Sequence, residues 1–145
     1  TPAPAGDGSV TWTLPEGWTL ANGSSARYAT IAVAGPDGTK GELAITHFPG
    51  DVGGDLANVN RWRGQIGLAP IADAELAASI TKVSAGQKTI RIMDATGAQT
   101  RCTAGWVKHG DETWFFKFTG PDALVDAEKA KFTAFLESVR FTKPE

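Results

Sequence analysis

Residues 55–68 read DLANVNRWRGQIGL, and the organisation of the rest of the chain is interpreted around this stretch. Asp55 is predicted to cap the free N–H groups of a first helical turn, and its charge suits the positive end of the helix dipole. Gly67 is predicted to close the last turn, and Pro70 prevents the helix from resuming. The stretch therefore predicts one amphipathic helix.

Arg63 is the unusual residue of this helix. On a helical wheel of roughly 100° per residue, it falls inside the apolar arc, between Val59 and Leu56. Either its head snorkels to water, or it is held at a pocket and presents its fork to an anionic group, because unpaired burial is costly. The apolar arc consists of Leu56, Val59 and Ile66 with Trp62 at its edge, and the opposite side carries Asn58, Arg61 and Gln65.

Length and composition indicate one globular domain. The chain has 145 residues, of which 41% are apolar and 21% charged, and its net charge of −2 does not favour nucleic-acid binding. Its single cysteine, Cys102, excludes an internal disulfide. The two histidines, His47 and His109, lack zinc-site spacing, so we expect neither a metal nor another cofactor.

The first eight residues, TPAPAGDG, are predicted to form a flexible leader, and residues 9–145 a single domain. A Pro/Ala/Gly leader is typical of a chain from which a secretion or lipoprotein signal has been removed, and equally of a shortened chain. We favour the first interpretation, which predicts an extracytoplasmic protein of the cell envelope or periplasm. Any membrane contact would then be through an N-terminal lipid anchor.

The clearest hairpin spans residues 99–108 and 113–119, around the two-residue turn Gly110-Asp111. This turn places Val107 opposite Trp114 and Trp106 opposite Phe115. Both faces are largely apolar, which predicts a central hairpin that is covered on both sides. One face carries Gly105, Val107, Trp114, Phe116 and Phe118, and the other carries Cys102, Ala104, Trp106, Phe115 and Lys117.

The remaining segments complete an α+β pattern. A last helix begins with Pro121 at its first position, and its apolar stripe contains Glu128, which is either solvated or paired with a cation such as Arg63 or Lys117. The economical architecture is an antiparallel sheet of about six strands, sandwiched between helices on both faces. Strands are predicted at 10–14, 27–33, 41–48, 79–83 and 88–95, a helical turn at 73–78, and an edge strand at 140–142.

Four segments carry a family resemblance: LPEGW at 14–18, the helix at 58–68, the strand at 114–121 and FTAFL at 132–136. In this order they resemble the PsbP-like fold, the α/β/α sandwich of the photosystem II extrinsic protein and the Ran release factor superfamily. The segment NVNRWRGQ at 58–65 also looks like that of uncharacterised bacterial envelope lipoproteins with this fold. The resemblance implies a binding or assembly module.

Two functions are compatible with these patterns. The first is a non-catalytic binding or assembly module of the bacterial cell envelope with an unknown partner protein, since no catalytic set is recognisable; its contact surface would comprise Asn58, Arg61, Trp62 and Gln65. The second is a small-ligand carrier or enzyme with a pocket between the first helix and the sheet. Its cations would be Arg63 and Lys117, its walls Trp62, Trp106 or Trp114, and His47 its catalytic candidate.

Overall fold

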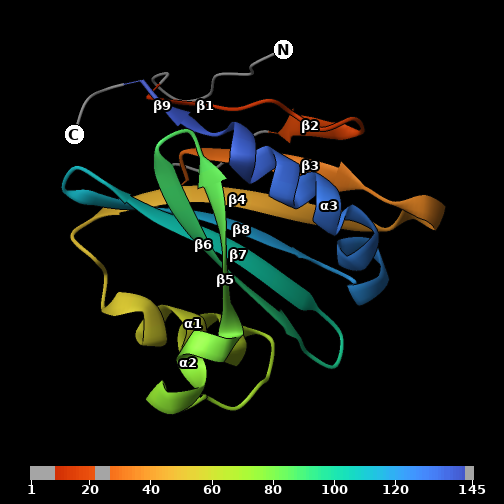
Figure 1. Cartoon of the computed structure of the whole chain (residues 1–145). Helices are drawn as coiled ribbons and strands as arrows, with labels where there is room; N and C mark the ends of the chain where they lie inside the picture. Colours follow the sequence, from red (N-terminus) through yellow and green to blue (C-terminus); the bar gives the residue numbers. More distant parts are fainter. Residues whose placement is uncertain (1–8, 22–26, 143–145) are drawn as a thin grey trace.

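The computed structural model describes residues 9–21 and 27–142, so the predicted leader at 1–8 lies outside the described residues. Its main element is a sheet of seven antiparallel strands in the order β2-β3-β4-β8-β7-β6-β5, and β1 and β9 form a separate two-stranded ribbon (Figure 1). The strands are β1 (Val10–Thr11), β2 (Trp18–Ala21), β3 (Ala29–Ala34), β4 (Lys40–Pro49), β5 (Ile80–Ala85), β6 (Lys88–Thr96), β7 (Arg101–His109), β8 (Glu112–Gly120) and β9 (Arg140–Phe141), and the helices are α1 (Gly54–Gln65), α2 (Asp73–Ser79) and α3 (Asp122–Ser138).

Helices cover both faces of the sheet, as the sequence predicted (Figure 1). The long helix α3 packs on one face, and the pair α1 and α2 packs on the other. The seventh strand is β2, which sequence reasoning missed. A turn precedes this strand, since the Trp18 amide donates to the Pro15 carbonyl at 3.1 Å, and the chain then continues directly as an edge strand.

The central hairpin has the register that its turn predicted. Val107 lies opposite Trp114, and Trp106 lies opposite Phe115. Its two faces belong to two separate cores, which confirms that it is covered on both sides. The α3 side contains Val107, Trp114, Phe116 and Phe118, and the α1 side contains Cys102, Ala104, Trp106 and Phe115.

The larger core lies under α3, and the predicted apolar stripe of that helix is buried there. Pro121 is the residue before the helix rather than its first residue. Glu128 is paired with neither Arg63 nor Lys117: its Oε1 accepts a hydrogen bond from Trp18 Nε1 at 3.0 Å. The buried residues of the stripe are Leu124, Val125, Phe132, Phe135, Leu136 and Val139.

The predicted edge strand at 140–142 is only two residues long and does not join the main sheet. It pairs with β1, so that Val10 lies opposite Phe141. This ribbon brings the start and end of the described chain together over the α3 side of the molecule (Figure 1). There Trp12, only 1% exposed, packs against Phe135 of α3 with ring centroids 5.7 Å apart.

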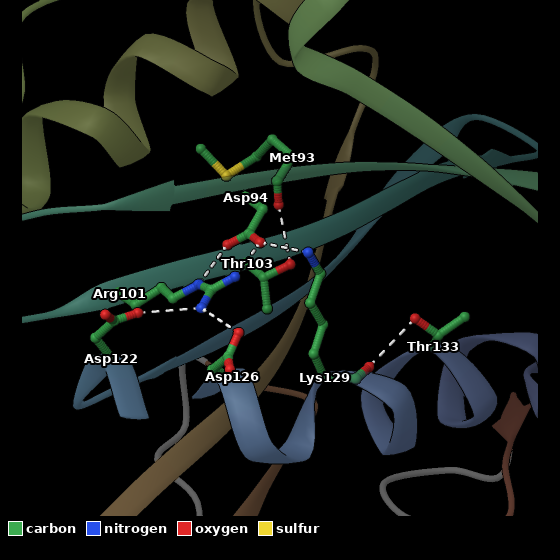
Figure 2. A network of polar contacts seen from close by, with 8 residues as sticks. All are labelled: Met93, Asp94, Arg101, Thr103, Asp122, Asp126, Lys129 and Thr133. Carbon is green, nitrogen blue, oxygen red and sulfur yellow. Dashed lines mark hydrogen bonds and ion pairs between the residues drawn. The ribbon is translucent and has the colours of Figure 1, made fainter. Parts of the chain in front are cut away.

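Arg101 joins the sheet to the first turns of α3 (Figure 2). Its guanidinium donates to both carboxylate oxygens of Asp94 on β6, at 2.9 and 2.6 Å, and to Asp122 and Asp126 of α3, at 3.0 and 3.1 Å. Lys129 of α3 reaches the same Asp94 carboxylate at 2.8 Å. The Arg101 side chain is only 11% exposed, so these contacts are less screened by solvent than ordinary surface pairs.

We expect Arg101→Gln to lower the free energy of unfolding by about 1–3 kcal/mol, because it removes a bidentate ion pair and both links from Arg101 to α3. Chemical denaturation at neutral pH measures this loss. Asp126→Asn is the control, since the Asp126 side chain is 74% exposed and a surface partner contributes less than about 1 kcal/mol. An Arg101→Gln protein as stable as wild type would contradict the role of this network.

The same network predicts how stability depends on pH. Burial alone would raise the pKa of Asp94, but hydrogen bonds from Arg101 and Lys129 outweigh burial and lower the pKa. A carboxyl pKa that is lower in the folded state stabilises the fold above the unfolded pKa of about 3.9, and this contribution is lost as the pH falls through the folded pKa. Asp94→Asn should therefore be less stable than wild type at neutral pH, and the difference should shrink below about pH 4. Equal differences at both pH values, measured by urea denaturation, would refute this assignment.

Candidate functional site

Helix α1 is attached to the sheet through Asp55, in a way that the sequence did not predict. The residue before the helix is Gly53, in a left-handed conformation, and no side chain caps the first turn. Asp55 instead accepts a hydrogen bond from Trp106 Nε1 at 2.8 Å, and its other oxygen lies 3.4 Å from Arg91 Nε. The expected closure at the other end is confirmed, with Gly67 at φ +82°.

The buried face of α1 differs from the predicted apolar arc. Asn58, expected on the polar side, is fully buried, while Leu56 is only half-buried. The indole of Trp62 decides this orientation, because it is 2% exposed and packs against Trp106 and Phe115, with ring centroids 5.3 and 5.8 Å away. Trp62 is therefore a core residue, and almost none of its surface is open to a ligand.

A hollow of about 200 Å³ lies between α1 and the strands β4 and β8. We call it the α1 groove. It brings together four of the residues that the sequence singled out: Arg61, Trp62 and Gln65 from α1, and Lys117 from β8. The remaining lining residues are Arg27, Ala44, Thr46, Phe48 and Phe115.

Arg61 is held in a fixed position at the edge of this groove. Its Nη1 donates to Oδ1 of the buried Asn58 at 2.7 Å. The guanidinium carbon lies 5.4 Å from the ring centre of Trp62 and 5.7 Å from that of Phe115, within the range of cation–π attraction. Burial lowers the pKa of Arg61. Asn58 thus contributes by orienting Arg61.

Lys117 supplies a second cation from the central strand β8. Its neighbours across the sheet are Ala44 and Ala104, whose small side chains leave room for it. The ammonium group donates to Oε1 of Gln65 on α1 at 3.1 Å. This hydrogen bond spans the groove between the sheet and the helix.

Arg63 and Lys117 do not share a pocket, contrary to the second functional hypothesis. Arg63 lines a different hollow, together with Asp94 and Lys129. Its Nε donates to the Ala69 carbonyl at 2.8 Å, so it ties the chain after α1 back to the helix. Of the two interpretations of Arg63, the structure is closer to the first. The residue is half-buried, and its guanidinium reaches outward to the carbonyl of the exposed residue Ala69.

Sequence reasoning missed Arg27 and Phe48, which also line the α1 groove. Phe48 is 44% exposed, and its place as a large aromatic residue at the end of the strand predicted at 41–48 is the only signal in the sequence that could have marked it. His47 is excluded from the groove by strand alternation, since Thr46 and Phe48 line it and His47 faces the other side of the sheet. There His47 Nδ1 lies 2.8 Å from Glu112, and the imidazole stacks on Trp114.

Comparison with known proteins identifies the fold of this chain. No family model matches the sequence, and no curated protein matches it. Among solved structures, that of cyanobacterial PsbP (CyanoP) from Synechocystis sp. PCC 6803 superimposes with a TM-score of 0.60 at 10% identity, covering 97% of this chain and 91% of CyanoP. The chain has the PsbP-like fold.

Two further structures share this PsbP-like fold in whole or in part. LpqN of Mycobacterium tuberculosis, described as involved in cell envelope biogenesis, superimposes with a TM-score of 0.64 at 14% identity, over 99% of this chain and 90% of LpqN. A protein of Bacteroides thetaiotaomicron gives a TM-score of 0.51 at 11% identity, over 98% of this chain and 48% of its own length. At these identities the comparisons establish the fold.

Two further features are absent from residues 9–21 and 27–142, the part of the chain that the structure describes. No group of three or more His, Cys, Asp or Glu side chains is arranged there to hold a metal ion. Within the same residues, no helix has the length and apolar character needed to cross a membrane. The α1 groove is the candidate site because Arg61, Gln65 and Lys117 meet in it.

Cys102 is a packing residue on the α1 side of the hairpin. It is 1% exposed, and burial raises the pKa of its thiol to about 12. Since the thiolate is the reactive form, this environment does not suit a nucleophile.

We expect Cys102 to resist iodoacetamide at about pH 8 in the native protein and to react readily once the protein is unfolded in urea, where the thiol regains a pKa near 8.5. Mass spectrometry of the alkylated protein measures the extent of reaction. Rapid labelling of the folded chain would show that the thiol is accessible and would overturn its assignment as a core residue.

Proposed function

We propose that the chain is a non-catalytic binding or assembly module of the bacterial cell envelope, tethered as a lipoprotein, whose partner contacts the α1 groove. The observation that carries the proposal is the convergence of Arg61, Gln65 and Lys117 on one hollow. Arginine and aromatic side chains are enriched at binding surfaces, and Arg61, Phe48 and Phe115 all line this hollow. The fold supports the cellular setting, because LpqN is described as acting in cell envelope biogenesis.

The size of the α1 groove favours contact with part of a larger partner. Pockets that enclose a whole small ligand usually measure about 300–1,000 Å³. The hollow beside α1 measures about 200 Å³, which suits a single side chain or terminal group. The alternative, a small-ligand carrier or enzyme, is supported by the existence of this hollow, but its catalytic candidate His47 faces the other side of the sheet.

The proposal is tested by capture of partners from a bacterial envelope extract. The immobilised protein is compared with Arg61→Ala/Lys117→Ala, which removes both cations of the groove while leaving the core residue Trp62 in place. We expect at least one envelope protein to be retained by wild type and reduced about tenfold or more by the double substitution, since charged hydrogen bonds contribute about 1.5–3 kcal/mol each.

The matched control is Lys82→Ala/Lys108→Ala, which removes the same number of positive charges. Both lysines are exposed and neither lines the groove. Retention of the same proteins by wild type and the groove variant would refute binding at this surface. Loss of retention in the control as well would reduce the interaction to nonspecific attraction by positive charge.

A further inference from the structure

Among the residues that the structure describes, two cations of the α1 groove each donate to an amide oxygen and to no carboxylate. Arg61 donates to Asn58 at 2.7 Å, and Lys117 donates to Gln65 at 3.1 Å. An amide oxygen carries only a partial charge, so it satisfies hydrogen bonding without neutralising the cation. Both groups also have further N–H donors beyond the single hydrogen bond described.

Arg27 provides a contrast within the same groove, because its charge is already balanced. Its guanidinium lies 2.8 Å from a carboxylate oxygen of Glu42. Arg61 and Lys117 therefore leave two positive charges without a carboxylate in direct contact among the described residues. This local excess stands out because the net charge of the chain is −2.

The geometry of Arg61 favours recognition of a carboxylate. Its guanidinium is positioned by the hydrogen bond to Asn58 and by the cation–π contacts with the rings of Trp62 and Phe115. Such a preorganised fork loses little conformational freedom on binding and can donate two parallel hydrogen bonds. Lys117 can approach the same anion as a point charge from the sheet.

The wall of the groove also offers an apolar contact. Phe48 is 44% exposed, one of two large hydrophobic side chains exposed to this degree among the described residues. It packs against Phe115 with ring centroids 6.1 Å apart, so its outer part faces the groove entrance or solvent. A partner that brings an apolar side chain next to its acid would cover this surface.

We propose that the α1 groove receives an acidic side chain of a protein partner, with its carboxylate held by Arg61 and Lys117 and an adjacent apolar side chain packed on Phe48. This inference rests on the proposed function and specifies the chemistry of its partner. The hollow of about 200 Å³ accommodates one such side chain, and the uncompensated cations supply the complementary charge.

The test uses two capped dipeptides, acetyl-Asp-Phe-amide and acetyl-Asn-Phe-amide, which differ only in the charge of one side chain. Each is titrated into isotopically labelled protein while the indole N–H of Trp62 and the backbone amides of β4 and β8 are followed by NMR. The Asp peptide should shift these signals at millimolar concentration, and its affinity should exceed that of the Asn peptide by about tenfold or more.

Two variants, Arg61→Gln and Lys117→Gln, should each weaken the Asp peptide by about tenfold or more, whereas the control Lys82→Gln/Lys108→Gln should bind it as wild type does. Unchanged dispersion of the remaining amide signals shows that each variant is folded. Equal binding of the two peptides, unchanged binding by the groove variants, or no binding of either peptide would overturn the inference. Inorganic phosphate that binds more tightly than the Asp peptide would overturn the assignment to a carboxylate.

The outcomes separate this inference from the proposed function. An envelope protein whose capture depends on Arg61 and Lys117, together with equal binding of the two peptides, would leave the proposed function standing and remove the acidic partner. Selective binding of the Asp peptide, with no envelope protein dependent on the groove, would remove the proposed function. It would leave only the preference of the groove for a carboxylate.

Discussion

The position of α1, and with it the candidate site, depends on the contact between Trp62 and the pair Trp106 and Phe115 of the central hairpin. The ring centroid of Trp62 lies 5.3 Å from that of Trp106 and 5.8 Å from that of Phe115. The hydrogen bond from Trp106 Nε1 to Asp55, at 2.8 Å, holds the first turn of the helix over the same strand. An aromatic contact of this size dominates packing, so it determines which side of the helix is buried.

The orientation of α1 in turn explains why two polar groups of the helix are placed where they are. With Trp62 inside, Asn58 is also buried, and its oxygen becomes available to Arg61. Arg61 remains exposed, and its guanidinium lies over the rings of Trp62 and Phe115. A core contact thus fixes a cation at the rim of the hollow that we propose as a binding site.

The two faces of the sheet differ in the size of their hydrophobic cores. The α3 face carries the larger core and is reinforced by the network of Arg101, Asp94 and Lys129. On the opposite face, two of the strand residues that line the groove, Ala44 and Thr46, have small side chains. Small residues leave space beside α1, whereas a uniform layer of large apolar side chains would have filled it. The larger core therefore lies on one face, and the candidate site lies on the other.

The sequence by itself determined the antiparallel sheet covered on both faces, the register of the Gly110-Asp111 hairpin and the buried stripe of α3, because turn residues and periodicity act over short stretches of chain. It also singled out Arg61, Trp62, Gln65 and Lys117, although it could not show that they meet. Only the tertiary structure decided which side of α1 is buried, that Asp55 binds Trp106 rather than the helix end, and that Arg63 lies apart from Lys117. These outcomes depend on contacts between residues far apart in the chain, such as the pairing of β4 with β8, and local patterns do not specify such contacts.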